Sequence, residues 1–547
     1  MRSLAIAVLV LLIASACEQT KNKSVESKID SLFHEWDNRT SPGAAVAVVK
    51  DGNVVFKKGY GMSNMEYDVP ITPSSIFHIA SESKQYVAYC IVLLAREGKL
   101  DLDDEVRKYL PYVPDFGKKI TIRQLIYHTS GLRDQWQLLA IGGQALEDVI
   151  TQQHIIKLVE KQKELNFEPG SRMLYCNTGY TLLAEIVRKV SGKSLRVFTD
   201  ERIFKPLGMT HTHFHDDNTE IDKNRTYSYD KTDSGKFINS PLNYATVGAT
   251  SLFTTVEDEI KWLLNYETGT VGGMDAVNQM YQQCVLNNGR KLRYAFGIAV
   301  DSAKGYLRVG HGGADAGYRT YAVRFPEERL GIVVFSNLGN FNPTDLAMKV
   351  AAFYLPERKD AATPKSSYKI DSALLPLFAG KYTSDEEGPL ELIDSGRLYL
   401  KVNRQFYEMD PLSDSSFSLL NGRLKYTFES RPKAPAKRFV VETPTEQVTF
   451  YRIGEIQLTD IQKIAYTGTY ESDELEAKYH IALENGKLVL RHRKYPDTGL
   501  APITDSQFST GHWWMSNLLF MRNKNGEIIG FEVNSDRVLH LKFKKIE

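Results

Sequence analysis

The segment that most constrains the fold is residues 81–98, where a serine and a lysine precede an apolar helix. Its apolar side chains recur at the 3.6-residue period of a helix. They are Val87, Ala88, Ile91, Leu94 and Ala95. Gly98 supplies a C-terminal stop. Ser81 and Lys84 are three residues apart, so they lie on one face at the start of a buried and therefore rigid helix.

A serine hydroxyl is a poor nucleophile until a neighbouring base removes its proton, and a neutral lysine amine can act as that base. A Ser-x-x-Lys pattern on its own recurs by chance, so it needs partners elsewhere in the chain. Tyr175 and Asn177 are one candidate pair, because side chains two residues apart in an extended loop point the same way. Such a tyrosine can relay a proton, and the asparagine amide offers donors and an acceptor. The alternative is an ordinary turn before the helix expected at 182–190.

The third element is His311-Gly312-Gly313-Ala314. Glycines in this position let a ligand approach the backbone closely. Residues 318–325 and 330–336 flank the turn at 326–329 and predict a β-hairpin. We therefore expect His311 on or just before a strand that borders a pocket.

In this order, the three elements resemble the serine beta-lactamase and penicillin-recognising hydrolase family. They resemble most its branch of D-aminopeptidases, DD-peptidases and esterases, in which His-x-Gly replaces Lys-Thr-Gly. Five further stretches match the family, at 42–49, 120–125, 128–132, 206–209 and 255–258. The resemblance covers roughly residues 25–355. It implies an α+β fold in which helices flank an antiparallel sheet.

The resemblance also implies a serine hydrolase that works through an acyl-enzyme. Ser81 would be the nucleophile, Lys84 its activator and Tyr175 a proton shuttle, with His311 as the fourth catalytic side chain. Water would hydrolyse the Ser81 ester in a second step.

For substrate binding, the resemblance implies that Asn177 holds the acyl amide and that Gly313 and Ala314 border the substrate. The backbone N–H groups of Ser81 and Ala314 would form the oxyanion hole. Three places differ from the usual family pattern. Thr250-Ser251 replaces a glycine pair, so the pocket wall there is expected to be narrower. Cys176 stands where serine is usual and is expected to pack conservatively, and Glu82 is expected to face solvent.

His311 bears on the substrate class, because histidine is mostly neutral near pH 7 whereas lysine is charged. Substrates with a free carboxylate beside the scissile bond, penicillins included, should therefore be poor. Small peptides with D-residues, amides and esters should be better. Two alternatives remain: a beta-lactamase or DD-carboxypeptidase, and a penicillin-binding sensor or cell-surface binding protein that is acylated without turnover.

The composition does not favour a nucleic-acid partner, because 68 Lys and Arg residues nearly balance 67 Asp and Glu residues. The length of 547 residues allows three to four domains. No cofactor is expected.

Residues 1–17 predict an export signal, with Arg2, an apolar run at 4–13 and Ala14-Ser15-Ala16 before Cys17. A bacterial lipoprotein is expected, lipidated at Cys17 and held in the periplasm or cell envelope by that anchor alone. A free exported protein is the alternative. The remaining cysteines suggest no disulfide framework.

His211, His213 and His215 would share one face of a strand, where they could bind a metal. They follow Pro206-Leu207-Gly208-Met209 as a comparable segment does in metal-free relatives, so no metal site is expected.

The last third of the chain contains a repeat. Gly380-Lys381-Tyr382 and Pro411 to Phe417 recur as Gly468-Thr469-Tyr470 and Pro502 to Phe508. After a linker at 356–367, we expect β-domains at 368–452 and 464–547, each a barrel of about eight strands.

The same layout occurs in the D-aminopeptidases of this family, where a loop from the barrels restricts the entrance to the active site. Spacers or partner-binding modules are the alternative. The aromatic stretch 512–515 is expected to be barrel core or to contact the catalytic domain.

Overall fold

The computed structural model describes residues 25–356, 358, 367–402, 405–420, 422–429, 434–443 and 446–546. The expected signal peptide with Cys17, and most of the expected linker, lie outside these residues. The chain forms two compact units. The first contains the described residues up to 100, with 184–283 and 293–358; the second contains 101–183, 284–292 and the described residues from 367 onward. The segment 25–355 therefore contributes to both units.

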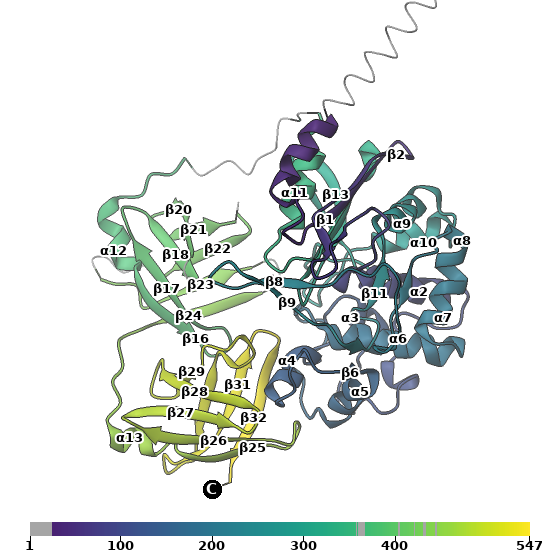
Figure 1. Ribbon diagram of the computed structural model, residues 1–547. Helices are drawn as coiled ribbons and strands as arrows, with labels where there is room; N and C mark the ends of the chain where they lie inside the picture. The colour runs from purple at the N-terminus through teal and green to yellow at the C-terminus, as the bar shows by residue number, and fades with distance from the viewer. Residues whose placement is uncertain are drawn as a thin grey trace, which may run out of the picture. The chain divides into compact units, whose positions relative to one another are not determined.

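The first unit is built on a six-stranded antiparallel sheet (Figure 1). In spatial order its strands are β12 (Ala299–Ala303), β13 (Tyr306–Asp315), β14 (Tyr318–Phe325), β15 (Leu330–Ser336), β1 (Ala44–Lys50) and β2 (Asn53–Tyr60). The hairpin expected from 318–336 is confirmed, because β14 and β15 pair from Arg319↔Ser336 to Phe325↔Leu330.

Helices cover both faces of this sheet, which is why β1 is apolar at almost every position. On one face, Val46 and Val48 share a core with Val350 of α11 (Pro343–Ala351). On the other face, Leu263 of α9 (Val256–Thr268) lies against Gly331. This is the α+β arrangement expected from the sequence.

A second, three-stranded sheet precedes the helix that starts near Ser81. Its order is β5 (Phe77–His78), β11 (Leu252–Thr254) and β7 (His213–Phe214). Phe253 on β11 pairs with His78 on one side and with His213 on the other. The chain therefore reaches Ser81 from a strand that is paired to residues far along the sequence.

In the second unit, the C-terminal barrel is closed by eight strands (Figure 1). They are β25 (Gly468–Ser472), β26 (Ala477–Glu484), β27 (Lys487–His492), β28 (Tyr495–Pro502), β29 (Gln507–Ser509), β30 (Leu518–Arg522), β31 (Ile528–Ser535) and β32 (Val538–Lys545). Trp514 and Met515 are buried in its core, as expected for that aromatic stretch.

The other β-domain is a nine-stranded sheet. Its strands are β16 (Gly380–Ser384), β17 (Gly388–Asp394), β18 (Leu398–Val402), β19 (Gln405–Glu408), β20 (Asp410–Ser413), β21 (Ser416–Leu419), β22 (Leu424–Phe428), β23 (Arg438–Glu442) and β24 (Gln447–Ile453). This sheet has one strand more than the barrel. Its chain is interrupted at Met409, so two strands, β19 and β20, lie where the barrel has the single strand β28. β18 pairs with β19 as β27 pairs with β28, and β20 pairs with β21 as β28 pairs with β29.

The sequence repeat has a structural counterpart. Gly380 and Gly468 begin equivalent strands with φ of +145° and +134°. Two residues later, Tyr382 and Tyr470 are fully buried, and each donates a hydrogen bond of 2.8 Å to the carbonyl four residues earlier. The two β-domains are therefore built on one plan.

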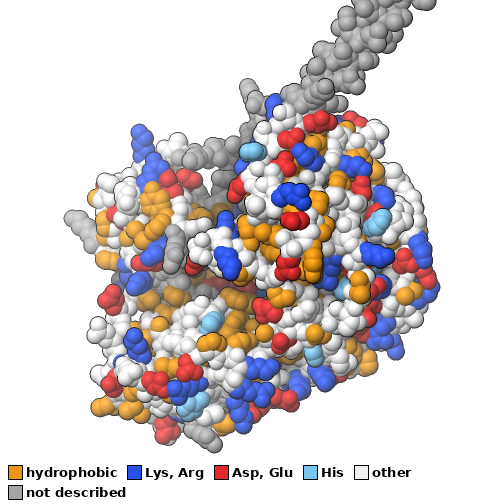
Figure 2. Space-filling model, viewed as in Figure 1, with side chains coloured by type: hydrophobic (Ala, Val, Ile, Leu, Met, Phe, Trp, Pro, Cys, Tyr) orange, Lys and Arg blue, Asp and Glu red, His pale blue; other side chains and the backbone are white. Residues whose placement is uncertain are grey.

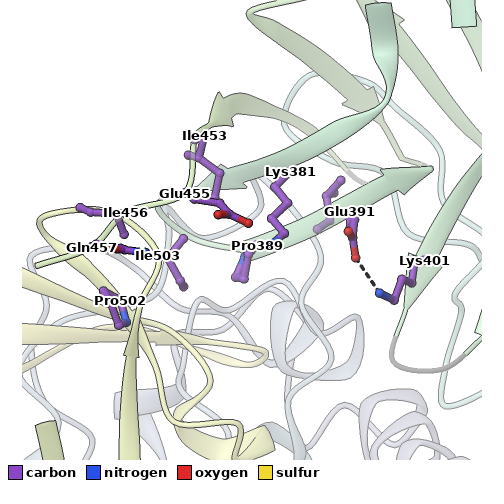
Figure 3. Close-up of a pocket in the computed structure, with 12 residues that line it drawn as sticks. Lys381, Pro389, Glu391, Lys401, Ile453, Glu455, Ile456, Gln457, Pro502 and Ile503 are labelled. Atoms are coloured by element: carbon purple, nitrogen blue, oxygen red, sulfur yellow. Dashed lines mark hydrogen bonds and ion pairs between the residues drawn. The ribbon is translucent and has the colours of Figure 1, made fainter. Parts of the chain in front are cut away.

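A pocket lies where these two β-domains meet (Figure 3). Lys381, Glu391 and Lys401 line it from β16–β18, and Pro502 and Ile503 line it from the barrel. An ion pair of 2.8 Å joins Glu391 to Lys401. None of the site residues predicted from the sequence lines this pocket.

The face shown in Figure 2 carries acidic and basic side chains interspersed, without a patch of one sign. Among the described residues, no helix combines the length and the apolar character needed to cross a bilayer.

Candidate active site

Ser81 lies in a short 3₁₀ turn, η2 (Ala80–Glu82), that leads into α2 (Ser83–Arg96). Ala80 has a φ of +49°, a left-handed conformation that non-glycine residues rarely adopt. The hydroxyl of Ser83 holds the turn, since it donates to the Ala80 carbonyl at 2.6 Å and accepts from the Leu252 amide at 3.0 Å. The expected helix is confirmed, with Ser81 in the turn before its first residue.

The Lys84 side chain is fully buried. Its Nζ donates to Ser81 Oγ at 3.0 Å and to the Ala249 carbonyl at 2.7 Å. Ser81 lies in the 3₁₀ turn and Lys84 in the first turn of α2, and this spacing of three residues brings the hydroxyl and the amine to one side. Burial favours the neutral form of an amine, which is the form that can accept the serine proton.

β13 packs against this turn at Gly313. A Cβ at Gly313 would lie 2.1 Å from the Ile79 carbonyl oxygen and 2.4 Å from Thr320 Oγ1, so only glycine fits. Thr320 Oγ1 donates to the same carbonyl at 3.0 Å. On the β12 side, the described pairing of β13 ends at Gly310, since the β12 register ends at Ala299↔Gly310. Some backbone N–H groups of 311–315, the segment that contains Ala314, therefore point away from β14.

His311 lies on β13, as expected, and is half-buried. Its Nε2 is 3.4 Å from the hydroxyl of Tyr294, and its Nδ1 is 2.6 Å from the Gly312 carbonyl. Burial lowers the pKa of His311 to about 4, with a contribution from Lys84 when that amine carries its proton. The imidazole is therefore neutral at pH 7.

The expectation that Glu82 faces solvent is wrong. Glu82 is fully buried. Burial raises the pKa of Glu82 well above its usual range, and the neighbouring Glu259 raises it further. The physical reason is the 3₁₀ turn, which points residue 82 into the protein while Ser81 and Lys84 share another side.

In the second unit, Tyr175 ends a loop and Asn177 is the first residue of α6 (Asn177–Ser191). The ring of His128 stacks on Tyr175 at 4.1 Å between centroids. Asp134 Oδ2 accepts from the Asn177 backbone N–H at 2.7 Å and from its amide Nδ2 at 2.8 Å. Asp134 therefore sets which way the Asn177 amide points.

Cys176 is buried between these two residues. Burial, assisted by the charge of Asp134, raises the pKa of its thiol to about 12. The thiolate is the nucleophilic form of cysteine, so Cys176 has a packing role, as the sequence suggested.

The C-terminal barrel supports the Tyr175 loop. Arg537, in the turn between β31 and β32, places its guanidinium 5.0 Å from the centre of the Tyr175 ring. The Arg537 backbone accepts a hydrogen bond of 2.9 Å from Asn166 and donates one of 2.9 Å to Gln137. The fully buried Arg133 donates to both oxygens of Glu474 at 2.8 and 2.6 Å.

α4 (Gln135–Ile141) completes this contact (Figure 1). Leu138, Ala140 and Ile141 belong to the hydrophobic core of the barrel. Gln137 Nε2 donates to the Ser535 and Trp514 carbonyls at 2.5 and 3.1 Å. The barrel is therefore packed against α4, in the same unit as the Tyr175 loop. A domain that served only as a spacer would not require this contact.

The predicted residues are divided between the units. Ser81, Lys84, His311, Gly313 and Ala314 lie in the first, and Tyr175 and Asn177 lie in the second.

The sequence analysis assigned no role to His128, Asp134 or Arg537. His128 lies within the matching stretch 128–132, which was a signal for its position. No local pattern points to Arg537, which is far from Tyr175 in the sequence.

A family model described as Beta-lactamase matches residues 29–355, more than half of the chain. The chain belongs to the beta-lactamase family. This member of the family carries a buried lysine bonded to a serine at a helix start. It is a serine hydrolase.

Similarity to individual proteins extends over almost the whole chain. A D-aminopeptidase from Brucella anthropi is 27% identical over 527 residues, covering 92% of this chain and 96% of that protein. A D-aminopeptidase from Brucella ovis is 25% identical, covering 93% and 96%. The described β-domains therefore belong to a region that these relatives share.

Two solved structures have similar folds. The octameric penicillin-binding protein homologue from Pyrococcus abyssi has a TM-score of 0.55 and 26% identity, and the match covers 78% of this chain and 99% of that one. The D-amino acid amidase from Ochrobactrum anthropi SV3 has a TM-score of 0.51 and 22% identity, covering 60% and 99%. The second match supports the fold alone.

Proposed function

We propose that this chain is an exported D-aminopeptidase-like hydrolase that cleaves peptide-like amides through an acyl-enzyme on Ser81. The observation that carries the proposal is the 3.0 Å contact between Lys84 Nζ and Ser81 Oγ at the start of α2. The D-aminopeptidase relatives, which align over more than nine-tenths of this chain, support the choice among hydrolases.

In the first step, the neutral Lys84 amine takes the proton from Ser81 Oγ, and the oxygen attacks the substrate carbonyl. The N–H groups of Ser81 and Ala314 stabilise the oxyanion; each such donor is worth about 3 kcal/mol in comparable acyl-transfer enzymes. The C–N bond then breaks, and the leaving amine receives a proton through Tyr175. Water hydrolyses the Ser81 ester in the second step and restores the hydroxyl.

The neutral His311 supports the substrate class. Without a positive charge at this position, a free carboxylate beside the scissile bond gains no ion pair and loses its hydration. Amides without that carboxylate pay no such cost. Asn177, whose amide donates to Asp134 at 2.8 Å, would bond the substrate amide on the acyl side.

The proposal extends to cellular location. Residues 1–17 have the order of a bacterial lipoprotein signal, so we propose lipidation at Cys17 and residence in the periplasm or cell envelope. Mass spectrometry of the mature N-terminus tests this, since a diacylated Cys17 is expected and cleavage elsewhere would contradict it.

The enzymatic test compares D-alanine p-nitroanilide, L-alanine p-nitroanilide and a chromogenic cephalosporin, with Ser81→Ala as the control. We expect the D-anilide to have the highest kcat/KM and the Ser81→Ala variant to be inactive on all three. Faster turnover of the cephalosporin would instead identify a beta-lactamase. A covalent adduct that persists for hours in intact-mass spectra, without product, would identify a sensor.

A further inference from the structure

A cluster of four side chains surrounds one point beside β7 in the first unit. His213 lies on β7, His215 follows it, and the loop that comes next returns Glu220 and Asp222 to the same place. His213 Nε2 is 3.4 Å from His215 Nδ1 and 3.4 Å from Asp222 Oδ1. His215 Nδ1 is 3.2 Å from Asp222 Oδ2 and 3.8 Å from Glu220 Oε2.

These separations match the geometry of a tetrahedral zinc site. Nitrogen and carboxylate oxygen ligands bind Zn²⁺ at about 2.0–2.2 Å, which places two ligand atoms about 3.3–3.6 Å apart. Two imidazoles with one or two carboxylates are also a donor set that suits zinc. Three of the four measured separations agree with this distance to within about 0.2 Å.

Burial gives a second and independent indication. His215 is 2% exposed, and the Asp222 side chain is 9% exposed. Asp222 Oδ2 lies 3.2 Å from His215 Nδ1, so this largely buried carboxylate faces the two histidines. A buried carboxylate is costly unless a positive charge lies beside it. A cation at the centre of the cluster supplies that charge.

Glu220 is held in place from outside the cluster. Arg196 donates to its two oxygens at 2.5 and 2.7 Å and also to Asp216 Oδ1 at 3.1 Å. A partner of this kind orients a ligand without contacting the metal. The arginine also offsets part of the negative charge of Glu220 and Asp222.

We propose that His213, His215, Glu220 and Asp222 bind one Zn²⁺ ion at a structural site. The sequence analysis expected no metal here, because the histidine run follows Pro206-Leu207-Gly208-Met209 as a comparable segment does in metal-free relatives. It did not include the carboxylates that return from the following loop. His211, the third member of that run, is exposed and lies outside the cluster. Four protein ligands leave no open position for a substrate, which makes the site structural and not catalytic.

The site lies in the sheet that leads to Ser81. The rings of His213 and His215 contact Phe253 of β11 at 5.9 and 4.6 Å between centroids. On its other edge, β11 pairs with His78 of β5, three residues before Ser81. Zinc therefore ties the loop 216–222 to this sheet and stabilises the strand that leads to the nucleophile.

The test uses the full-length protein, stripped with a chelator and titrated with Zn²⁺ against a chromophoric competitor, with metal content measured by elemental analysis. We expect one tightly bound Zn²⁺ per chain and a rise in Tm on binding. The His213→Ala and Asp222→Asn variants should lose more than about 100-fold in affinity, since loss of outer partners alone costs 10–100-fold. His211→Ala is the matched control and should bind like the parent chain.

Arg196→Gln provides a second variant that leaves all four ligands in place. We expect about a tenfold loss of affinity, because Glu220 is then less well oriented. The proposal is overturned if the parent chain binds no stoichiometric Zn²⁺ and shows no Tm shift. It is also overturned if His211→Ala weakens binding as much as Asp222→Asn does.

Discussion

Replacing Glu82 with glutamine should stabilise the protein, and the gain should increase with pH. Burial raises the pKa of this carboxyl well above its ordinary value, with Glu259 adding to the effect. The folded chain therefore binds a proton at Glu82 that the unfolded chain releases above pH 4.5. By linkage, this costs nothing at low pH, and the cost grows as the pH rises towards the folded-state pKa.

The magnitude follows from the free energy of protonation. Each pH unit above the ordinary pKa of 4.5 adds at most about 1.4 kcal/mol to the cost of keeping this carboxyl protonated in the folded chain. Glutamine has nearly the same shape and no charge, so Glu82→Gln removes this cost. We therefore expect Tm to rise, and to rise more at pH 7 than at pH 5.

Calorimetric unfolding of the full chain at the two pH values measures the effect. Glu97→Gln is the matched control at the other end of α2, because Glu97 is partly exposed and bonded to Arg202 and Lys99, which lower its pKa. Its replacement should give no gain at either pH. An equal gain for Glu82→Gln at pH 5 and pH 7, or a loss at pH 7, would refute the reasoning from protonation.

Three further predictions concern the candidate site. Lys84→Met keeps the length of the side chain but cannot accept the Ser81 proton, so kcat should fall about 10²–10⁴-fold, with unchanged KM, in steady-state assays; a smaller fall would assign the base elsewhere. Gly313→Ala places a Cβ 2.1 Å from a backbone oxygen, so both Tm and kcat should drop. A variant with the parental Tm would show that β13 can shift to accommodate the methyl group without loss of stability. Arg537→Ala removes the cation over Tyr175, worth about 1 kcal/mol. Its kcat should fall by less than about tenfold, and an unchanged kcat would show that this cation does not position Tyr175.

The elements that the sequence predicted well depend on local patterns. The hairpin 318–336 has alternating strands on either side of a Pro-containing turn, and the structure has the same hairpin. Likewise, the repeated Gly-x-Tyr marks equivalent strands, because the glycine adopts positive φ and the tyrosine packs two residues later. Such features are set by residues within a few positions of each other.

The features that the sequence did not predict depend on distant neighbours. Glu82 is polar and looks exposed, but the 3₁₀ turn and the later segments that pack against it bury its side chain. The sequence analysis did not predict the interruption at Met409, which separates β19 from β20. Arg537 meets Tyr175 only because α4 is packed into the core of the barrel.

The packing of α4 into the barrel also sets an order of events during synthesis. Leu138 and Ile141 are translated early, whereas their neighbours Val538, Leu541 and Phe543 are among the last residues of the chain. Since chains emerge from the ribosome N-terminus first, at about 5–20 residues per second, the loop that bears Tyr175 waits some tens of seconds for its final support. A chain that stops before β31 therefore lacks the residues that support Tyr175, so translation of β31 and β32 becomes a condition for that support.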